Sequence, residues 1–160
     1  MKKKLLIFSL LTILALAMTG CGSSESEDPS AQKESIDSLD NSVVEAYLNQ
    51  YNLDAENTIS TDDLSSDDDE TFTCKIAKLD VKLSAPDEDL TVDVTFDDLN
   101  NENLDVVVRD LIIAMDADLT YENVQDMFTA FRDNGKTSYD LGNVKVKLSE
   151  KSGTYDFKIS

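Results

Sequence analysis

Carboxylates are the side chains with which this chain could most readily do chemistry. The sequence has 33 Asp and Glu residues against 14 Lys and Arg, and it has no histidine. Asp67, Asp68, Asp69 and Glu70 follow one another directly and offer the hard oxygen ligands that calcium takes. Their spacing does not match an EF-hand loop, which also needs a glycine at its sixth position. We therefore expect weak calcium association at most, and a solvated acidic loop is the alternative.

Catalysis would have to rely on the same carboxylates. The absence of histidine removes the commonest general base, the Ser–His and Cys–His nucleophile pairs, and zinc sites that need an imidazole. The sequence also has no G-x-S-x-G, G-x-G-x-x-G, G-x-x-x-x-G-K or C-x-x-C motif. A glycosidase-type enzyme needs only two carboxylates, but among 33 acids a suitable pair arises by chance. The sequence thus favours a protein that is not an enzyme and has no cofactor, with a carboxylate-dependent hydrolase as the catalytic alternative.

Three tyrosines and one cysteine are the other candidates for a site. Tyr47, Tyr51 and Tyr155 could line a ligand groove, although tyrosines at helical or strand spacing commonly belong to the core with the hydroxyl at its rim. Cys74 alternates with Phe72 and Ile76, which is the spacing of a strand. We expect this cysteine to be a small buried hydrophobic residue and not a reactive thiol.

The N-terminal segment indicates where the protein resides. Residues 2–4 are three lysines, residues 5–17 are almost wholly apolar, and residues 18–21 read Met-Thr-Gly-Cys. A basic stretch, a short apolar stretch and small residues before a cleavage point are typical of a secretory signal. The segment resembles a bacterial lipoprotein signal, in which the cysteine is lipidated and becomes the mature N-terminus; Met18 stands where that family usually has Leu. The resemblance implies that residues 1–20 are removed and that Cys21 carries a diacylglyceryl lipid, which anchors the protein on the extracytoplasmic face of the cell membrane.

The remaining chain divides into a tether and one domain. Residues 21–35 are rich in Ser and acidic residues and lack apolar periodicity, which predicts a flexible tether with a reach of roughly 20 Å. Residues 36–160 are expected to form a single domain. Without residues 1–20 the chain has 11 basic and 33 acidic residues, a net charge of −22. This charge argues against nucleic acid as a partner, because nucleic-acid binding needs a basic surface.

Hydrophobic periodicity predicts an α+β fold. Helical spacing is found at about 38–51, where Asn41 or Ser42 could act as a cap, at 101–116, and from a cap at Thr120 to a stop at Gly135. The Val and Ile residues of 101–116 favour a strand by propensity, so a strand is the alternative to the expected helix there. Residues 78–97 and 144–159 alternate on both sides of a turn and predict two hairpins. We expect an antiparallel sheet of about four strands with about three helices on one face, and a second face rich in Lys, Asp and Thr that is open to water.

Charge pairing predicts the register of the hairpins. Placing Leu83 opposite Val92 sets Lys82 against Asp93, and placing Leu148 opposite Tyr155 sets a lysine against an aspartate in the second hairpin. The apolar residues Phe72, Cys74 and Ile76 alternate in the opposite phase to Leu79 and the strand that follows, which suggests a bulge near Ala77. Residues 57–70 are expected to be a loop. The tetrapeptide Val-Lys-Leu-Ser recurs at 81–84 and 146–149, which raises the alternative of an internal duplication of a helix and hairpin.

These features favour one functional interpretation over two others. The chain is expected to be a lipid-anchored, extracytoplasmic module that binds an envelope protein or peptide. The alternatives are an acidic surface lipoprotein that associates with calcium, and the carboxylate-dependent hydrolase.

Overall fold

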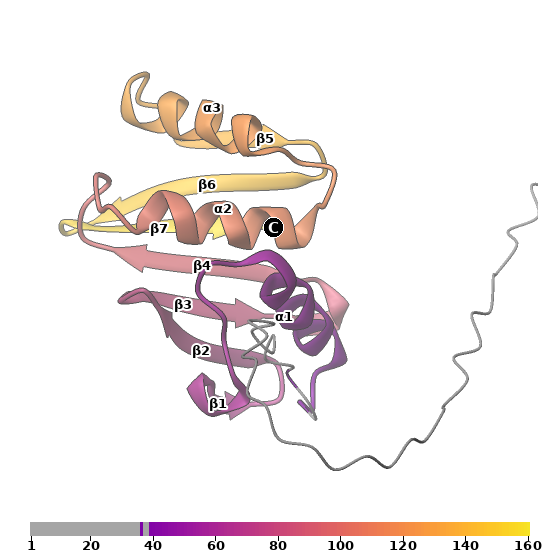
Figure 1. The fold of residues 1–160 in the computed structure, drawn as a ribbon. Helices are drawn as coiled ribbons and strands as arrows, with labels where there is room; N and C mark the ends of the chain where they lie inside the picture. Colours follow the sequence, from indigo (N-terminus) through magenta and orange to yellow (C-terminus); the bar gives the residue numbers. More distant parts are fainter. Residues whose placement is uncertain (1–35, 37–38) are drawn as a thin grey trace, which may run out of the picture. The chain divides into compact units, whose positions relative to one another are not determined.

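The structure, a computed structural model, describes Ile36 and residues 39–160. The proposed signal, Cys21 and the proposed tether lie outside the described residues. A seven-stranded antiparallel sheet has the strand order β1-β2-β3-β4-β7-β6-β5, and three α-helices pack on one of its faces (Figure 1). The strands are β1 (Ser65–Asp68), β2 (Thr71–Ile76), β3 (Leu79–Ser84), β4 (Thr91–Phe96), β5 (Ser138–Leu141), β6 (Val144–Lys151) and β7 (Thr154–Ile159). The helices are α1 (Ser42–Asp54), α2 (Leu104–Met115) and α3 (Tyr121–Arg132), with short 3-10 turns at Thr61–Asp63 and Pro86–Glu88.

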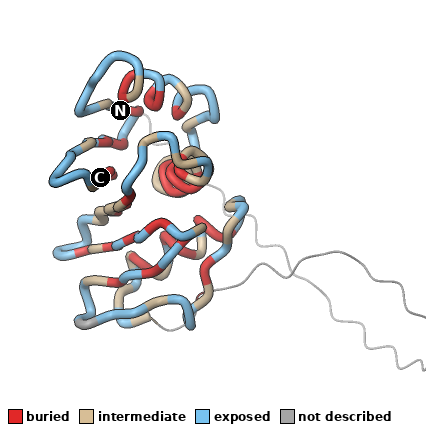
Figure 2. Tube along the Cα trace, turned by 90° about the vertical axis from the view of Figure 1, so that its left-hand side faces the viewer, coloured by how far each residue is buried: buried red, intermediate tan, exposed pale blue. Residues whose placement is uncertain are grey.

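The core lies between the sheet and the helices. Buried positions alternate along the central strands, and in Figure 2 the buried segments concentrate in the interior while the loops are exposed. Phe157 on β7 contacts Phe96, Phe128 and Phe131, with ring centroids 5.1, 5.9 and 5.2 Å away. The aromatic contacts therefore join α3 to the two central strands. No helix of the described chain is long and apolar enough to cross a bilayer.

The α+β class is as expected, but the sheet has seven strands and not about four. The strand around Cys74 is β2, a full neighbour of β3. The expected bulge near Ala77 is instead a two-residue turn, in which Ala77 and Lys78 have φ values of 47° and 73°. A turn of this type reverses the chain between two paired strands, and this explains the phase change that the sequence shows.

The two edge strands were also missed. Part of the expected loop at 57–70 forms β1, whose Ser and Asp residues show no apolar alternation. β5 has one buried residue, Leu141, so its pattern is too short to read. Strand β7, the last of the chain, is an inner strand of the sheet, because it pairs with both β4 and β6.

The predicted register is right for the first hairpin and wrong for the second. Leu83 pairs with Val92 and Lys82 with Asp93, as predicted from charge. In the second hairpin Leu148 pairs with Phe157, so the prediction was wrong by two residues. The cause is a tight two-residue turn at Ser152 and Gly153, with φ values of 57° and 86°, which fixes the register more strongly than surface charge does. The terminal strands therefore place Lys147 opposite Lys158.

The two halves of the sheet have the same strand pairing. Eight of the eleven pairs within β2-β3-β4 correspond to a pair within β5-β6-β7 after a shift of 65 positions, as in 146 − 81 and 159 − 94. The matching pairs include Ile76–Leu79 with Leu141–Val144 and Val81–Val94 with Val146–Ile159. The recurring Val-Lys-Leu-Ser segments fall at equivalent places. This relationship supports a duplicated three-stranded unit, in place of the helix and hairpin considered from the sequence.

Capping residues mark where α1 and α3 begin, and buried apolar residues form the inner face of α2. Asn41 Oδ1 accepts hydrogen bonds from the amides of Val43 and Val44 at 3.1 Å, so it caps α1 as predicted. Thr120 and Asn123 form a capping box at the start of α3. The ambiguous segment 101–116 contains α2, whose residues Val107, Val108, Leu111 and Ile112 are fully buried.

Candidate functional site

The seam between α1 and α2 contains two hollows that share Gln50 and Ala114. The first has a volume of about 170 Å³ and extends to the first residue of α3. The second, of about 360 Å³, extends to the end of the sheet at Leu90 and Val144. We call the two together the helical groove. The first hollow is lined by Gln50, Tyr51, Asp54, Ala55, Arg109, Asp110, Ile113, Ala114 and Tyr121, and the second by Val43, Ala46, Tyr47, Gln50, Leu90, Ala114, Met115, Asn143, Val144 and Ser160.

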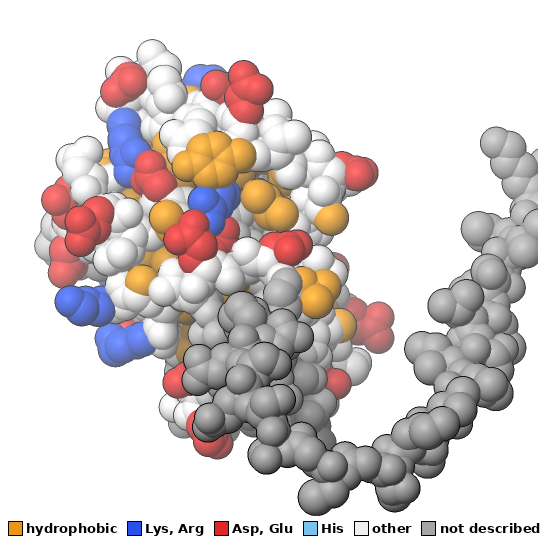
Figure 3. Space-filling view, viewed as in Figure 1, with side chains coloured by type: hydrophobic (Ala, Val, Ile, Leu, Met, Phe, Trp, Pro, Cys, Tyr) orange, Lys and Arg blue, Asp and Glu red, His pale blue; other side chains and the backbone are white. Residues whose placement is uncertain are grey.

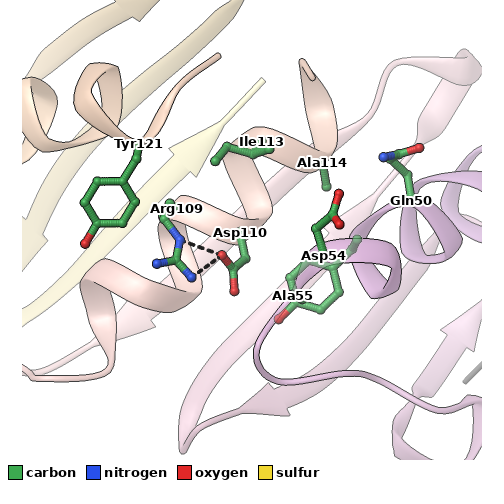
Figure 4. A pocket seen from close by; sticks show the side chains of 9 residues that line it. Gln50, Asp54, Ala55, Arg109, Asp110, Ile113, Ala114 and Tyr121 are labelled. Carbon is green, nitrogen blue, oxygen red and sulfur yellow. Dashed lines mark hydrogen bonds and ion pairs between the residues drawn. The ribbon is translucent and has the colours of Figure 1, made fainter. Parts of the chain in front are cut away.

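A charged network occupies the first hollow (Figure 4). Arg109 Nε donates to Asp110 Oδ1 at 2.7 Å, and Arg109 Nη2 donates to Glu56 Oε1 at 3.0 Å. Asp110 is 8% exposed, and its Oδ2 accepts the amide of Glu56 at 3.1 Å. Burial lowers the pKa of Arg109, but its hydrogen bonds to Glu56 and Asp110 outweigh burial and leave that pKa raised. The guanidinium is therefore a permanent, well-held cation in the hollow.

Tyr121 stands at the rim of this hollow. Its ring centroid lies 5.2 Å from Arg109 Cζ, which is cation–π distance, and Figure 4 shows the ring beside the guanidinium. Tyr121 is 56% exposed. In the part of the chain that the structure describes, only Tyr121 and Leu53 are large hydrophobic residues with such exposure. Figure 3 shows hydrophobic side chains interspersed with charged ones on this helical side.

The structure brings two of the three predicted tyrosines to the helical groove. Tyr47 lines the second hollow and Tyr51 the first, and both are almost fully buried. Their hydroxyls donate to the backbone carbonyls of Leu111, at 2.9 Å, and of Asn57, at 2.7 Å. Burial raises the pKa of both phenols. They form the floor of the groove, and their hydroxyls are already bonded to the protein.

Tyr155 belongs to neither hollow. It lies on β7 and stacks on Phe96, with ring centroids 5.7 Å apart. The expectation that the three tyrosines line one groove is therefore corrected for Tyr155. Sequence spacing could not place this residue, because its neighbours depend on the pairing of β4 with β7.

The acidic segment lies at the β1–β2 turn. Asp68 Oδ1 accepts the amide of Glu70 at 3.0 Å, and the carbonyl of Asp69 accepts from Asn41 Nδ2 at 3.2 Å. The side chain of Asp67 is outside what the structure describes. Within Ile36 and residues 39–160, no three His, Cys, Asp or Glu side chains gather in a way that could hold a metal ion. Calcium association stays a prediction.

Cys74 is a free, buried cysteine on β2, 8% exposed. Burial, with a smaller contribution from the charge of Asp63, raises the pKa of its thiol to about 12. A thiol that stays protonated at neutral pH is a poor nucleophile.

Comparison with known proteins adds no further assignment. The chain matches no protein-family model, no curated protein and no solved structure. The residues of the site must therefore carry the functional argument.

Two residues of the helical groove, Arg109 and Tyr121, were not singled out from the sequence. One signal was available for each. Tyr121 is an aromatic residue that lies off the buried stripe of α3, which runs through Val124, Met127 and Phe131. Arg109 is the only basic residue in 101–116. Neither signal indicates that the two side chains meet, because they come from different helices.

Proposed function

We propose that the chain is a lipid-anchored, extracytoplasmic interaction module that binds an envelope protein or peptide in the helical groove. Binding and not catalysis is its role. The observation that carries the proposal is the exposed Tyr121 beside Arg109 at the rim of a hollow that Ile113 and Ala114 also line. Aromatic and arginine side chains at the edge of a pocket are the types that dominate the binding energy of protein interfaces.

The chemistry of the groove favours a peptide over a small charged metabolite. Ile113, Ala114 and Met115 supply apolar wall, and the hydroxyls of Tyr47 and Tyr51 are engaged with the backbone. Arg109 is already paired with two carboxylates, so the hollow offers no free cation to an anionic ligand. A partner segment with an aromatic or aliphatic side chain fits such a surface, because it can fill the hollow and pack on Tyr121.

Site-specific crosslinking tests the groove directly. A photoreactive amino acid placed at Gln50, an exposed residue that lines both hollows, or at Tyr121 in the full chain should give a discrete adduct in intact envelopes. The same group at Thr129, exposed on α3 and outside the lining of both hollows, is the matched control. Adducts at all three positions with equal yield, or at none, would contradict the proposal. Tyr121→Ala should lower the yield from Gln50 by about tenfold if Tyr121 anchors the partner.

The lipid anchor is tested separately. The proposal expects the wild-type chain to remain with membranes and to carry acyl chains on residue 21, as seen by mass spectrometry. Cys21→Ser should leave the chain soluble after membranes are pelleted, since stable anchoring needs two acyl chains. Membrane retention of Cys21→Ser in high salt would show that another element attaches the protein.

A further inference from the structure

The sheet face opposite the helices carries six of the eight lysines in residues 39–160. The three helices pack on the other face (Figure 1), and strand alternation directs this face to water. We call it the open face. The charged residues of its strands are Lys75, Lys82, Lys145, Lys147, Lys151 and Lys158, with Asp68, Asp80, Asp93, Asp140 and Asp156.

The open face differs in charge from the rest of the domain. Residues 39–160 contain 10 Lys and Arg and 28 Asp and Glu, a net charge of −18. The strands of the open face carry six of the basic and five of the acidic residues, a net of +1, which leaves −19 for all other surfaces. Figure 3, which shows the helical side, has acidic side chains across that surface. The fold therefore separates charges that are mixed along the sequence.

The lysines at the centre of the open face form a row without ion pairs. Strand pairing places Lys82 beside Asp93, Asp93 beside Lys158, and Lys158 beside Lys147. Neighbouring strands lie about 4.8 Å apart, so these four side chains follow one another across β3, β4, β7 and β6. Lys82, Lys147 and Lys158 make no ion pair with any residue that the structure describes, whereas Lys75 and Lys145 pair with Asp80 and Asp140.

Two of these lysines oppose one another directly. Lys147 and Lys158 are cross-strand partners on β6 and β7, and both are exposed. Like charges in this position repel and destabilise the sheet. An anion that bridges the two ammonium groups would replace repulsion by attraction. The pair therefore marks the point of the open face where an anionic surface would be bound most strongly.

We propose that the open face docks onto an anionic lipid surface through Lys82, Lys147 and Lys158. Anionic phosphate headgroups complement exposed ammonium groups that have no ion pair, and lysines in contact with such a surface each add to binding. Screening over about 8 Å weakens the repulsion from acids on the far side of the domain. This inference rests on the lipid anchor proposed above, since a tether with a reach of roughly 20 Å keeps the domain at the surface. The anchored domain would then lie with its helical groove facing away from the membrane.

Lysine labelling on vesicles tests the orientation. The lipidated full chain is reconstituted into phosphatidylcholine vesicles with and without roughly one-third phosphatidylglycerol, and acylation of each lysine is followed by mass spectrometry. Labelling of Lys82, Lys147 and Lys158 should slow about threefold or more on anionic vesicles. It should recover in about 0.5 M salt, where the screening length is short. Lys78 and Lys136, exposed but outside the open face, are the internal controls.

Matched variants separate the possible outcomes. Lys147→Gln/Lys158→Gln should abolish the protection of Lys82, whereas Lys78→Gln/Lys136→Gln, with the same change in net charge, should not. Equal labelling on both vesicle types would overturn the inference while leaving the anchor intact. Protection on neutral vesicles that rises with protein concentration would mean a second copy covers the open face, and would also overturn it. Cys21→Ser co-sedimenting with anionic but not neutral vesicles, in a lysine-dependent way, would support the open face even if the anchor fails.

Discussion

The side chain of Asn52 binds the backbone of Ile59 on both of its polar groups. Asn52 Nδ2 donates to the Ile59 carbonyl at 2.7 Å, and Asn52 Oδ1 accepts the Ile59 amide at 2.9 Å. Asn52 is 2% exposed, so these groups have no access to bulk water. The pair holds the chain where it leaves α1, next to the Tyr51 hydroxyl that bonds Asn57 and forms part of the floor of the helical groove.

Removing the Asn52 side chain should destabilise the fold. Asn52→Ala leaves the buried amide and carbonyl of Ile59 without these partners, and we expect the free energy of unfolding to fall by about 2–4 kcal/mol. Urea unfolding monitored by circular dichroism measures this change. The control is Asn100→Ala, an exposed residue whose loss should matter by about 0.5 kcal/mol or less. Equal stability of the two variants would contradict the role assigned to Asn52.

Asp110 should stabilise the first hollow through its charge and through its position as an acceptor. Asp110→Ala removes the partner of Arg109 and of the Glu56 amide, and should lower stability by about 2–4 kcal/mol. Asp110→Asn keeps an acceptor for that amide, so its effect should be smaller. Asp126→Ala, at an exposed position of α3, is the control with the same change of charge. A loss for Asp110→Asn as large as that for Asp110→Ala would show that charge alone matters.

The turn between β2 and β3 should gain stability from residues that accept positive φ. Ala77 and Lys78 occupy the left-handed region, which favours Asn and Gly. Ala77→Asn/Lys78→Gly should raise the free energy of unfolding by about 1 kcal/mol. The reciprocal change, Gly153→Ala in the β6–β7 turn at φ 86°, should lower it by about 1 kcal/mol, because open space around Gly153 leaves backbone strain as the only cost. Changes of opposite sign would contradict this account.

The thiol of Cys74 should make stability depend on alkaline pH. Its pKa is raised to about 12 by burial, whereas an exposed thiol ionises near 9. The unfolded chain therefore loses this proton first, and stability should fall by about 1.4 kcal/mol per pH unit once the pH exceeds 9. The stabilisation is fully present below pH 9. Chemical unfolding at pH 8 and pH 10 measures the slope, and Cys74→Val should reduce it.

Alkylation gives an independent check of the same residue. At pH 8 the folded protein should react with iodoacetamide far more slowly than the urea-unfolded chain, since only the thiolate is nucleophilic. Equal rates in the two states would show that Cys74 is accessible and ionised in the fold.

Local sequence signals were enough for the elements that carry their own pattern. The caps at Asn41 and Thr120 and the alternation around Leu83 and Val92 fixed two helices and one hairpin correctly. Each depends on interactions between residues close in the chain, which spacing and side-chain type reveal. The amphipathic character of α2 likewise outweighed the β propensity of its valines.

The pairing of β2 with β3 and the register of β6 with β7 depend on two-residue turns that the types of their residues do not clearly indicate. Ala77 and Lys78 are unusual residues for a turn with two positive φ values, so β2 was read as a bulged extension of its neighbour. Gly153 indicates a tight turn between β6 and β7, and the length of this turn decides the register of the hairpin more strongly than charge pairing does. The edge strands β1 and β5 have too few apolar residues to be recognised and are held by pairing with their neighbours.

By itself, the sequence determined the chemical limits of this protein: no histidine, a strongly acidic chain, an α+β pattern and an N-terminal segment that resembles a lipoprotein signal. Only the tertiary structure decided which side chains meet. Arg109 and Tyr121 approach each other from two helices, and Lys82, Lys147 and Lys158 line up across strands up to 76 positions apart, as in 158 − 82. Such contacts are set by strand order and register between distant segments, and one-dimensional spacing does not contain that information.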